Sequence, residues 1–382
     1  MPMDVPASLL DFSLVQETSL DRRHRFPRLD RVSLPARIAV LVLVSWLPLL
    51  VLSLLEGGQL AHAFLRNVAT HVEFLVSLPL LVAADGYIDM RLAAAVRHFV
   101  ISELIDAKHL PRYEAIARDA TRGRRNGLIE AGLMVIAFAP SFVHVPYLPN
   151  RPAWLHAEPG GPLTLAGWWY LAVSMPIIRF LLLRWLWRAI LWAMFLFKVS
   201  RLPLAFVPTH PDATGGLGFL GTSQASFSVI VLALSATLTA QRLVHASSAN
   251  LSGYALHLFA FALICLVVVF SPMMFFFRQL LMAKRRGDHA YSGVASWHSR
   301  RFEQRWFHHE IPKGLEPLGA PEFSSQTDLN TSFTAARDMR WFPVDIRAAL
   351  AVVAAAMAPM VPLLLADRRF LEVVLALGKS VL

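Results

Sequence analysis

Residues 254–277 read YALHLFAFALICLVVVFSPMMFFF, a run that contains no Asp, Glu, Lys or Arg. The hydrocarbon core of a bilayer is about 30 Å thick, and an α-helix needs about 20 apolar residues to cross it. Lipid offers no hydrogen-bonding partner to backbone amides, so a chain that crosses it must satisfy them internally. The run therefore predicts a transmembrane helix.

Further apolar segments of similar length lie on both sides of this run. Together the segments occupy residues 38–55, 68–84, 127–144, 167–186, 226–241, 254–277 and 348–366. The chain of 382 residues is 56% hydrophobic and 16% charged, whereas about 25% of the residues of a soluble domain are charged. We expect an all-α polytopic membrane protein with about seven transmembrane helices, which form a transmembrane domain over residues 38–366.

The distribution of basic residues predicts the orientation. Lys and Arg accumulate on the cytoplasmic side of membrane proteins. With seven spans and a cytoplasmic N-terminal segment, residues 1–37, 26 of the 36 Lys and Arg fall in cytoplasmic stretches and 6 in outer stretches. We therefore expect the N-terminus inside and the C-terminus outside. The net charge of +10 then reflects topology and attraction to anionic lipids, and it does not indicate nucleic-acid binding.

Two cytoplasmic sections, residues 85–126 and 283–347, have the pattern of helices. In the first, a spacing of four predicts one apolar stripe, made of Leu92, Val96, Val100 and Leu104. In the second, Ser325 with Asp328 resembles a capping box and predicts the start of a helix. The tail, 367–382, has apolar residues at near-helical spacing. We expect it to lie along the outer interface as an amphipathic helix, with a re-entrant segment as the alternative.

One polar passage, VPTHPDATGGLGFLG at residues 207–221, separates the fourth and fifth apolar segments. Its turn residues are His210, Pro211, Asp212, Gly215, Gly216 and Gly218. The lysine and hydroxyl of a phosphate-binding P-loop are absent. Three interpretations remain: a structural turn, a gate sensitive to an ion or ligand, and a metal site that takes a third ligand from His308, His309 or Glu310. A backbone nest in the turn could bind an anion or be filled by the aspartate itself.

Together with DLNTSFTAARDMRWFPVD at residues 328–345, the passage resembles a family of uncharacterised bacterial multi-pass inner-membrane proteins with an HPD-x-x-GGLGFL motif, here residues 210–220. The resemblance implies a location in the bacterial inner (plasma) membrane and no particular activity. The seven-span layout also resembles that of the insect chemoreceptor ion channels. That resemblance implies an oligomer whose pore is lined by the last helix.

Several polar side chains fall inside the apolar segments. Ionisable groups there are costly and point to function by default. Arg179 lies near the middle of the fourth segment, with Glu73 and Glu130 as possible partners, whereas Arg184 and Arg188 lie nearer the inner face and could snorkel. We expect buried ion pairing or the lining of an anion pathway. In the fifth segment, one face carries Ser228, Ser235 and Thr239, which indicates either helix packing or a wet pathway.

No enzyme motif occurs in the chain, so we expect no catalytic activity, no cofactor and no resident metal. The single cysteine, Cys265, excludes an intrachain disulfide. The layout favours a homo-oligomeric ion channel or channel-like pore. The alternatives are a secondary transporter of a small anionic solute and a membrane sensor or assembly protein.

Overall fold

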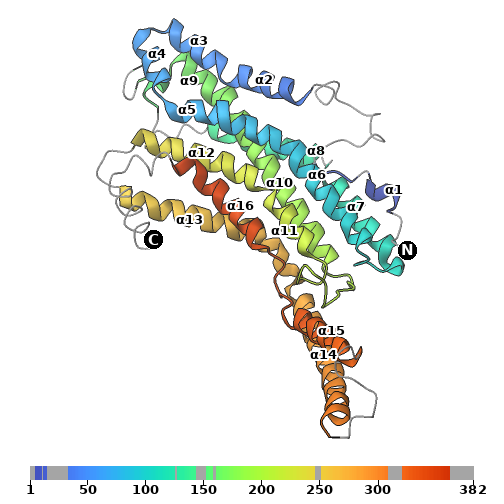
Figure 1. Cartoon of the computed structure of the whole chain (residues 1–382). Helices are drawn as coiled ribbons and strands as arrows, with labels where there is room; N and C mark the ends of the chain where they lie inside the picture. The colour runs from blue at the N-terminus through green and yellow to red at the C-terminus, as the bar shows by residue number, and fades with distance from the viewer. Residues whose placement is uncertain are drawn as a thin grey trace.

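The computed structural model of the chain describes residues 5–10, 12–14, 33–124, 127–142, 152–157, 161–245, 251–308 and 321–361. Within these residues the chain is helical and contains no β-strand (Figure 1). The expected C-terminal helix, 367–382, lies outside the described residues, as do His309 and Glu310.

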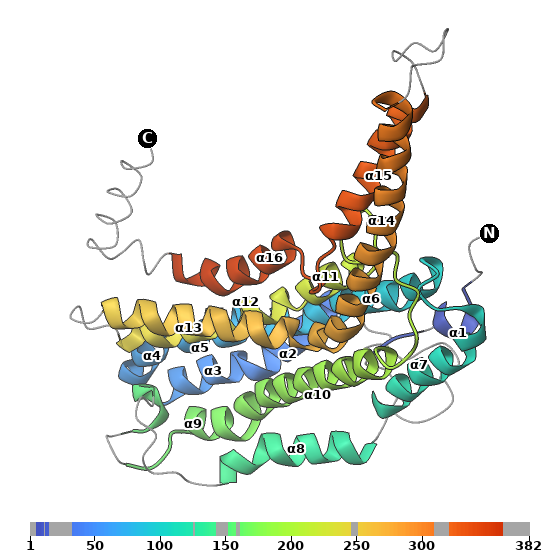
Figure 2. The same ribbon diagram turned by 90° about the horizontal axis from the view of Figure 1, so that it is seen from below.

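Long helices run roughly alongside one another and form the body of the molecule (Figure 2). The first are α2 (Leu34–Ser45) with α3 (Leu47–Leu55), the five-residue α5 (Val68–Val72), which continues through a π-helix into α6 (Leu78–Ile101), and α8 (Gly127–Phe142). They are followed by the five-residue α9 (Leu165–Trp169), which continues through a π-helix into α10 (Met175–Val199), and by α12 (Ser228–His245), α13 (Leu251–Phe270) and α16 (Ile346–Met357). The other helices of the body are α1 (Ala7–Leu10), α4 (Gly58–Leu65), α7 (Leu110–Arg124) and α11 (Gly218–Ala225).

Five helical stretches of the described chain are long and apolar enough to cross a membrane: Leu34–Leu55, Val68–Ile101, Leu165–Val199, Gly218–Leu243 and Phe259–Trp306. Two shorter apolar helices are Gly127–Ser141 and Ile346–Met360. Each of the seven apolar segments predicted from the sequence therefore overlaps one of these helices, but only five of the helices in the described chain are long enough to cross a membrane. The stretch around Glu73 and Pro79, which departs most from the apolar pattern, is helical without a break.

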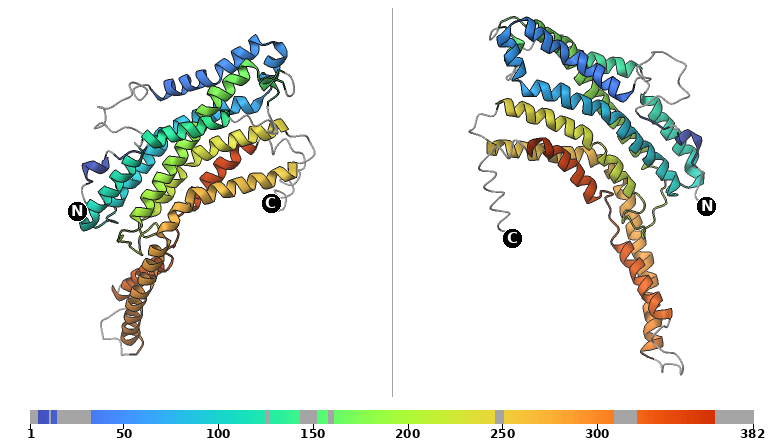
Figure 3. Two further views of the ribbon diagram at one scale, coloured as in Figure 1. Left: turned by 180° about the vertical axis from the view of Figure 1, so that it is seen from behind. Right: turned by 45° about the horizontal axis from the view of Figure 1, so that its top comes forward.

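Packing within the body brings helices from distant parts of the chain together. Helix α12 packs against α5, α6 and α16, and α16 also packs against α13. Helix α10 packs against α8 and α7 (Figure 3). The predicted apolar stripe is confirmed for Leu92, Val96 and Val100, which lie on α6 and are at most 2% exposed, whereas Leu104 is buried but lies beyond the end of the helix at Ile101. Helix α7 begins at Leu110 with Pro111 in its first turn, where the missing amide of a proline costs no hydrogen bond.

A helical hairpin projects from one end of the body, which we call the hairpin end (Figures 1 and 2). It consists of α14 (Phe277–Trp306) and α15 (Pro321–Arg337). The two helices are joined by an ion pair of 2.8 Å between Arg305 and Glu322 and by the ring of Phe323, which lies against Phe302 and Trp306. The hairpin therefore has an aromatic contact of its own.

The predicted capping box at the start of α15 is wrong. The helix already begins at Pro321, and the hydroxyl of Ser325 donates to the carbonyl of Pro321 from within the first turns. Proline is favoured in the first turn of a helix, and this preference sets the boundary earlier than the Ser325–Asp328 spacing indicates.

Candidate functional site

Two helices of the body contain a single π-turn at matching sequence positions. The sequence Val-Ser-x-Pro occurs at residues 76–79 and again at 173–176. In each case a five-residue π-helix ends at the serine: Glu73–Ser77 before α6 and Tyr170–Ser174 before α10. Proline has no amide to donate into the helix, and the turn before it widens. The repeat of Val-Ser-x-Pro is the signal that the sequence carries for this pair of π-turns.

Glu73 and Tyr170 hold the same position in the two π-turns. The carbonyl of Glu73 accepts a hydrogen bond from the amide of Leu78, and the carbonyl of Tyr170 accepts one from Met175. The ring of Tyr170 packs edge-on to Phe74, with 6.2 Å between ring centroids. The two π-turns therefore face each other and bring a carboxyl group and a phenol into one neighbourhood.

Arg179 completes this group, which we call the π-turn site: Glu73, Tyr170 and Arg179. Its charge acts on Glu73, and both charges act on Tyr170. Glu73 is 8% exposed, yet its carboxyl group makes no hydrogen bond or ion pair with any residue in the described part of the chain. The Arg179 guanidinium makes a long hydrogen bond of 3.4 Å to the hydroxyl of Ser141 on α8.

The structure does not bring Glu130 to this site. Glu130 is exposed and lies eleven residues before Ser141 on α8, which is about 16 Å along a helix. Of the two partners expected for Arg179, only Glu73 is close enough to interact with it.

Hydroxyl groups tie the π-turns to neighbouring helices. The hydroxyl of Ser77 donates to the carbonyl of Ala233 on α12, at 2.8 Å. The hydroxyl of Ser174 donates to the carbonyl of Ser45, at 2.7 Å, where α2 ends and α3 begins. These bonds hold each interrupted helix against a partner.

On α12, the predicted polar face divides between two roles. The hydroxyl of Ser235 is fully buried and donates to the carbonyl of Ala356 on α16, at 2.5 Å. Thr239 is 8% exposed, and its hydroxyl has no partner among the described residues. Ser228 is partly exposed at the start of the helix. Helix packing therefore accounts for Ser235 but not for Thr239.

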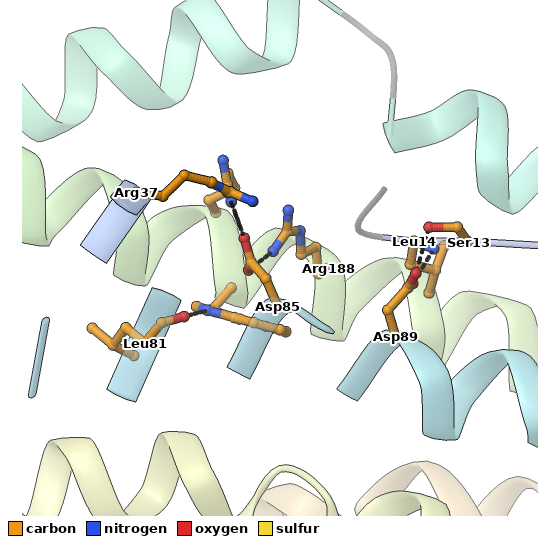
Figure 4. A network of polar contacts seen from close by, with 9 residues as sticks. Ser13, Leu14, Arg37, Leu81, Asp85, Asp89 and Arg188 are labelled. Atoms are coloured by element: carbon orange, nitrogen blue, oxygen red, sulfur yellow. Dashed lines mark hydrogen bonds and ion pairs between the residues drawn. The ribbon is translucent and has the colours of Figure 1, made fainter. Parts of the chain in front are cut away.

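A second group of charges lies nearer the hairpin end, centred on Asp85 of α6 (Figure 4). Arg188 of α10 contacts Oδ1 of Asp85 at 2.5 Å, and Arg184 of the same helix contacts Oδ2 at 2.7 Å. Arg37 of α2 contacts Oδ2 at 3.5 Å. We call these four residues the Asp85 cluster. The guanidinium of Arg188 also lies over the ring of Trp185, 4.9 Å from its centroid.

The prediction that Arg184 and Arg188 snorkel is wrong for Arg188, which is 5% exposed and ion-paired. A signal for the cluster exists in the sequence. Asp85 and Asp89 are four residues apart, as are Arg184 and Arg188, and residues with this spacing share one face of a helix. The sequence alone does not show that the two faces meet.

Asp89 holds the N-terminal part of the described chain against the body. Its carboxylate accepts a hydrogen bond of 2.6 Å from the hydroxyl of Ser13 and one of 2.8 Å from the amide of Leu14 (Figure 4). Leu14 is fully buried, and Phe12 packs against Phe195 of α10 with 5.7 Å between ring centroids. Residues 5–10 and 12–14 thus lie against α6 and α10 beside the Asp85 cluster.

The turn at 207–221 fills its own anion-binding nest. The carboxylate of Asp212 accepts hydrogen bonds from the amides of Thr214, Gly216 and Gly218, at 2.8, 3.1 and 2.8 Å. Gly215 and Gly216 have φ of 66° and 99°, a region that glycine enters without strain. Burial raises the pKa of the Asp212 carboxyl, but the three amides lower it more, so the pKa lies below its ordinary value.

This arrangement supports the structural interpretation of the turn. Nδ1 of His210 lies 2.8 Å from Oδ1 of Asp212, while Pro211 lies exposed between them. Within the residues that the structure describes, no group of three or more His, Cys, Asp or Glu could hold a metal ion. The backbone of the turn also binds the connector after α15, because the amide of Arg340 donates to the carbonyl of Ala213 at 2.6 Å.

No family model, curated protein or solved structure matches the chain. The resemblance through the HPD-x-x-GGLGFL motif stays a prediction, as does the resemblance in layout to the insect chemoreceptor channels.

Proposed function

We propose that the chain is a multi-pass membrane protein that transports a small anionic solute, with the π-turn site as its substrate and coupling site. The observation that carries the proposal is the position of Glu73 and Arg179 at two matched π-turns: Glu73 is only 8% exposed, and its carboxyl group has no hydrogen-bond or ion-pair partner among the described residues. Ionisable groups at membrane depth are costly and are retained for function. π-turns in helices recur at functional sites, and secondary transporters also place departures from regular helix around a central site, in the form of broken helices.

The residues of the site suit distinct roles. Arg179 supplies a positive charge that attracts an anion, and its planar guanidinium matches a carboxylate or phosphate group. Glu73 can take up a proton and so change the net charge of the site between the loaded and empty states. The phenol of Tyr170 offers a hydrogen-bond donor to the bound solute.

We also propose the orientation given by the basic residues, with the hairpin and the N-terminus inside the cell and the bacterial inner membrane as the location. Reporter fusions after residues 37, 126 and 308 test this orientation. Fusions that are active only in the cytoplasm support it, whereas a periplasmic hairpin would overturn it.

The transport experiment uses the full chain in proteoliposomes with an imposed pH gradient and a panel of small anions. Proton movement is followed with an internal dye, and anion uptake with radiolabel. Glu73→Gln should abolish the coupling between proton and anion movement, and Arg179→Ala should abolish anion uptake. Glu130→Gln is the matched control, because it removes an exposed carboxylate from another helix. Equal coupling in Glu73→Gln and the unsubstituted protein would contradict the proposal.

A homo-oligomeric channel is the second candidate, and the exposed apolar side chains favour it. Ile346 and Leu350 of α16 are 67% and 58% exposed, and Trp297 of the hairpin is 56% exposed. Lipid can cover the side chains of α16, but Trp297 lies on the projecting hairpin, where an exposed apolar side chain suits contact between subunits. An assembly of three or more subunits in mild detergent, with discrete current steps in planar bilayers, would favour this candidate over a carrier.

A further inference from the structure

Three guanidinium groups converge on a single carboxylate in the Asp85 cluster. Arg188 takes one oxygen of Asp85, and Arg184 and Arg37 share the other, at 2.7 and 3.5 Å. A carboxylate carries one negative charge, whereas each guanidinium carries one positive charge at all physiological pH values. Because Arg188 also pairs with Asp85, less than one negative charge remains to compensate the two positive charges of Arg37 and Arg184.

The donors of these two arginines are incompletely used. Nε of Arg184 is buried and donates to no acceptor in the described chain. The contact from Arg37 lies at the outer limit of a hydrogen bond. Both side chains are still accessible, with exposed fractions of 28% for Arg37 and 25% for Arg184. An external acceptor with several oxygens could bind the accessible parts of both guanidinium side chains at once.

We propose that Arg37 and Arg184 bind a phosphate-bearing anion, with Asp85 orienting the two guanidinium groups. Guanidinium forks match the oxygens of a phosphate group bidentately. Arg37 is the fourth residue of α2, and thus lies about 5 Å from the start of that helix. This shallow depth suits the phosphate of an anionic phospholipid, since basic pockets between transmembrane helices bind such headgroups. A free phosphate has the same chemistry.

The site is separate from the proposed transport site and does not rest on it. Arg184 lies five residues beyond Arg179 on α10, which is about 7.5 Å along the helix towards the hairpin end. Loss of phosphate binding and loss of transport are therefore distinguishable by substituting one arginine or the other.

The test measures the melting temperature of the full chain in two settings. In one, nanodiscs of phosphatidylcholine contain increasing fractions of phosphatidylglycerol; in the other, inorganic phosphate is titrated at constant ionic strength. We expect the melting temperature to rise with the ligand, because a ligand that binds only the folded state stabilises it. The double variant Arg37→Gln/Arg184→Gln should weaken binding about tenfold or more, given the usual strength of a charged hydrogen bond. Arg118→Gln, an exposed residue of α7, is the matched control.

Each outcome has a defined meaning. A rise with phosphatidylglycerol alone identifies a lipid headgroup, and a rise with phosphate as well identifies a free anion site. No rise in either setting, or the same rise in the double variant and the unsubstituted protein, overturns the proposal. If the double variant does not fold, Arg37→Gln alone serves, because its weak contact with Asp85 leaves the two pairs on α10 in place.

Discussion

The hydroxyl of Ser174 donates a 2.7 Å hydrogen bond to the backbone carbonyl of Ser45, and both residues are fully buried. This bond connects the π-turn before α10 to the point where α2 ends and α3 begins. Two interruptions from distant parts of the chain therefore stabilise each other, and this contact leads to the first prediction.

Ser174→Ala should destabilise the fold by only about 0.6–1.7 kcal/mol, the range measured for hydrogen bonds between helices in membranes. Thermal unfolding in detergent measures the loss. Transport should fall by more than this small loss of stability accounts for, because the orientation of the π-turn changes. Ser271→Ala, whose hydroxyl bonds only within its own helix region, is the control. A proportional loss of stability and transport would contradict this prediction.

Asp85→Ala should destabilise the protein by about 3–5 kcal/mol, because it leaves buried arginine charge without its counter-ion. The comparison is Asp119→Ala, which removes one partner of the Lys198–Asp119 ion pair; their side chains are 49% and 54% exposed. That change should cost at most about 1 kcal/mol. Chemical unfolding of both variants checks the difference, and similar losses would show that the Asp85 cluster contributes little.

Asp212→Asn should loosen the turn at 207–221, since an amide oxygen cannot replace a carboxylate that accepts from three backbone amides. We expect the free energy of unfolding to fall by about 1–3 kcal/mol. Faster proteolysis of the hairpin would measure this change. The pKa of Asp212 is lower in the folded protein than its ordinary value. The ionised Asp212 carboxylate therefore contributes its full share to the free energy of unfolding above about pH 4, and this share is lost as the pH falls through the pKa of the folded protein. The variant should lack this acid-dependent loss.

Gly287→Ala should separate the hairpin from the body. A Cβ atom at this position would lie 2.6 Å from Cβ of Pro208, and overpacking of this kind costs about 1–3 kcal/mol. Gly293→Ala on the same helix is the control, because a Cβ there meets nothing within 4 Å. That variant should be more stable by up to about 1 kcal/mol through helix propensity. Opposite shifts in melting temperature are the expected result, and shifts of the same sign would contradict it.

Asp89→Ala should release the N-terminal segment. In the unsubstituted protein the amide of Leu14 donates to the Asp89 carboxylate at 2.8 Å, so its hydrogen exchange should be slow. The variant should exchange that amide about tenfold faster or more, because a hydrogen bond to a charged group contributes about 1.5–3 kcal/mol. Glu114→Ala, which removes an exposed contact to Ser8, should leave the rate at Leu14 unchanged.

The sequence predicted the helices well because hydrophobic length determines them. Helices cover each of the seven apolar segments within the described residues, although only five are long enough to cross a membrane, and the spacing of Leu92, Val96 and Val100 correctly predicts the buried stripe of α6. The start of α15 was predicted four residues late. The Ser325–Asp328 spacing indicated a start at Ser325, but the helix begins at Pro321, in agreement with the preference of proline for the first turn.

The charged contacts were less predictable. Arg184 and Arg188 lie about one hundred residues from Asp85 in the sequence, and nothing local indicates that α6 and α10 meet there. Glu130 and Glu73 were equally plausible partners of Arg179 until the helices were placed. The paired π-turns were visible as a repeated Val-Ser-x-Pro, but only the backbone shows that the helix widens at both sites.

The projecting hairpin amplifies small rotations at its base. Gly287 packs against Pro208, and α14 continues from there to Trp306, which is about 30 Å of rigid helix. Geometry makes a tilt of about ten degrees at this pivot displace the far end by about 5 Å. One spin label at the far end of α14 and one on α7 would measure this displacement as a change in distance. The same tilt would change the distances between helices of the body very little.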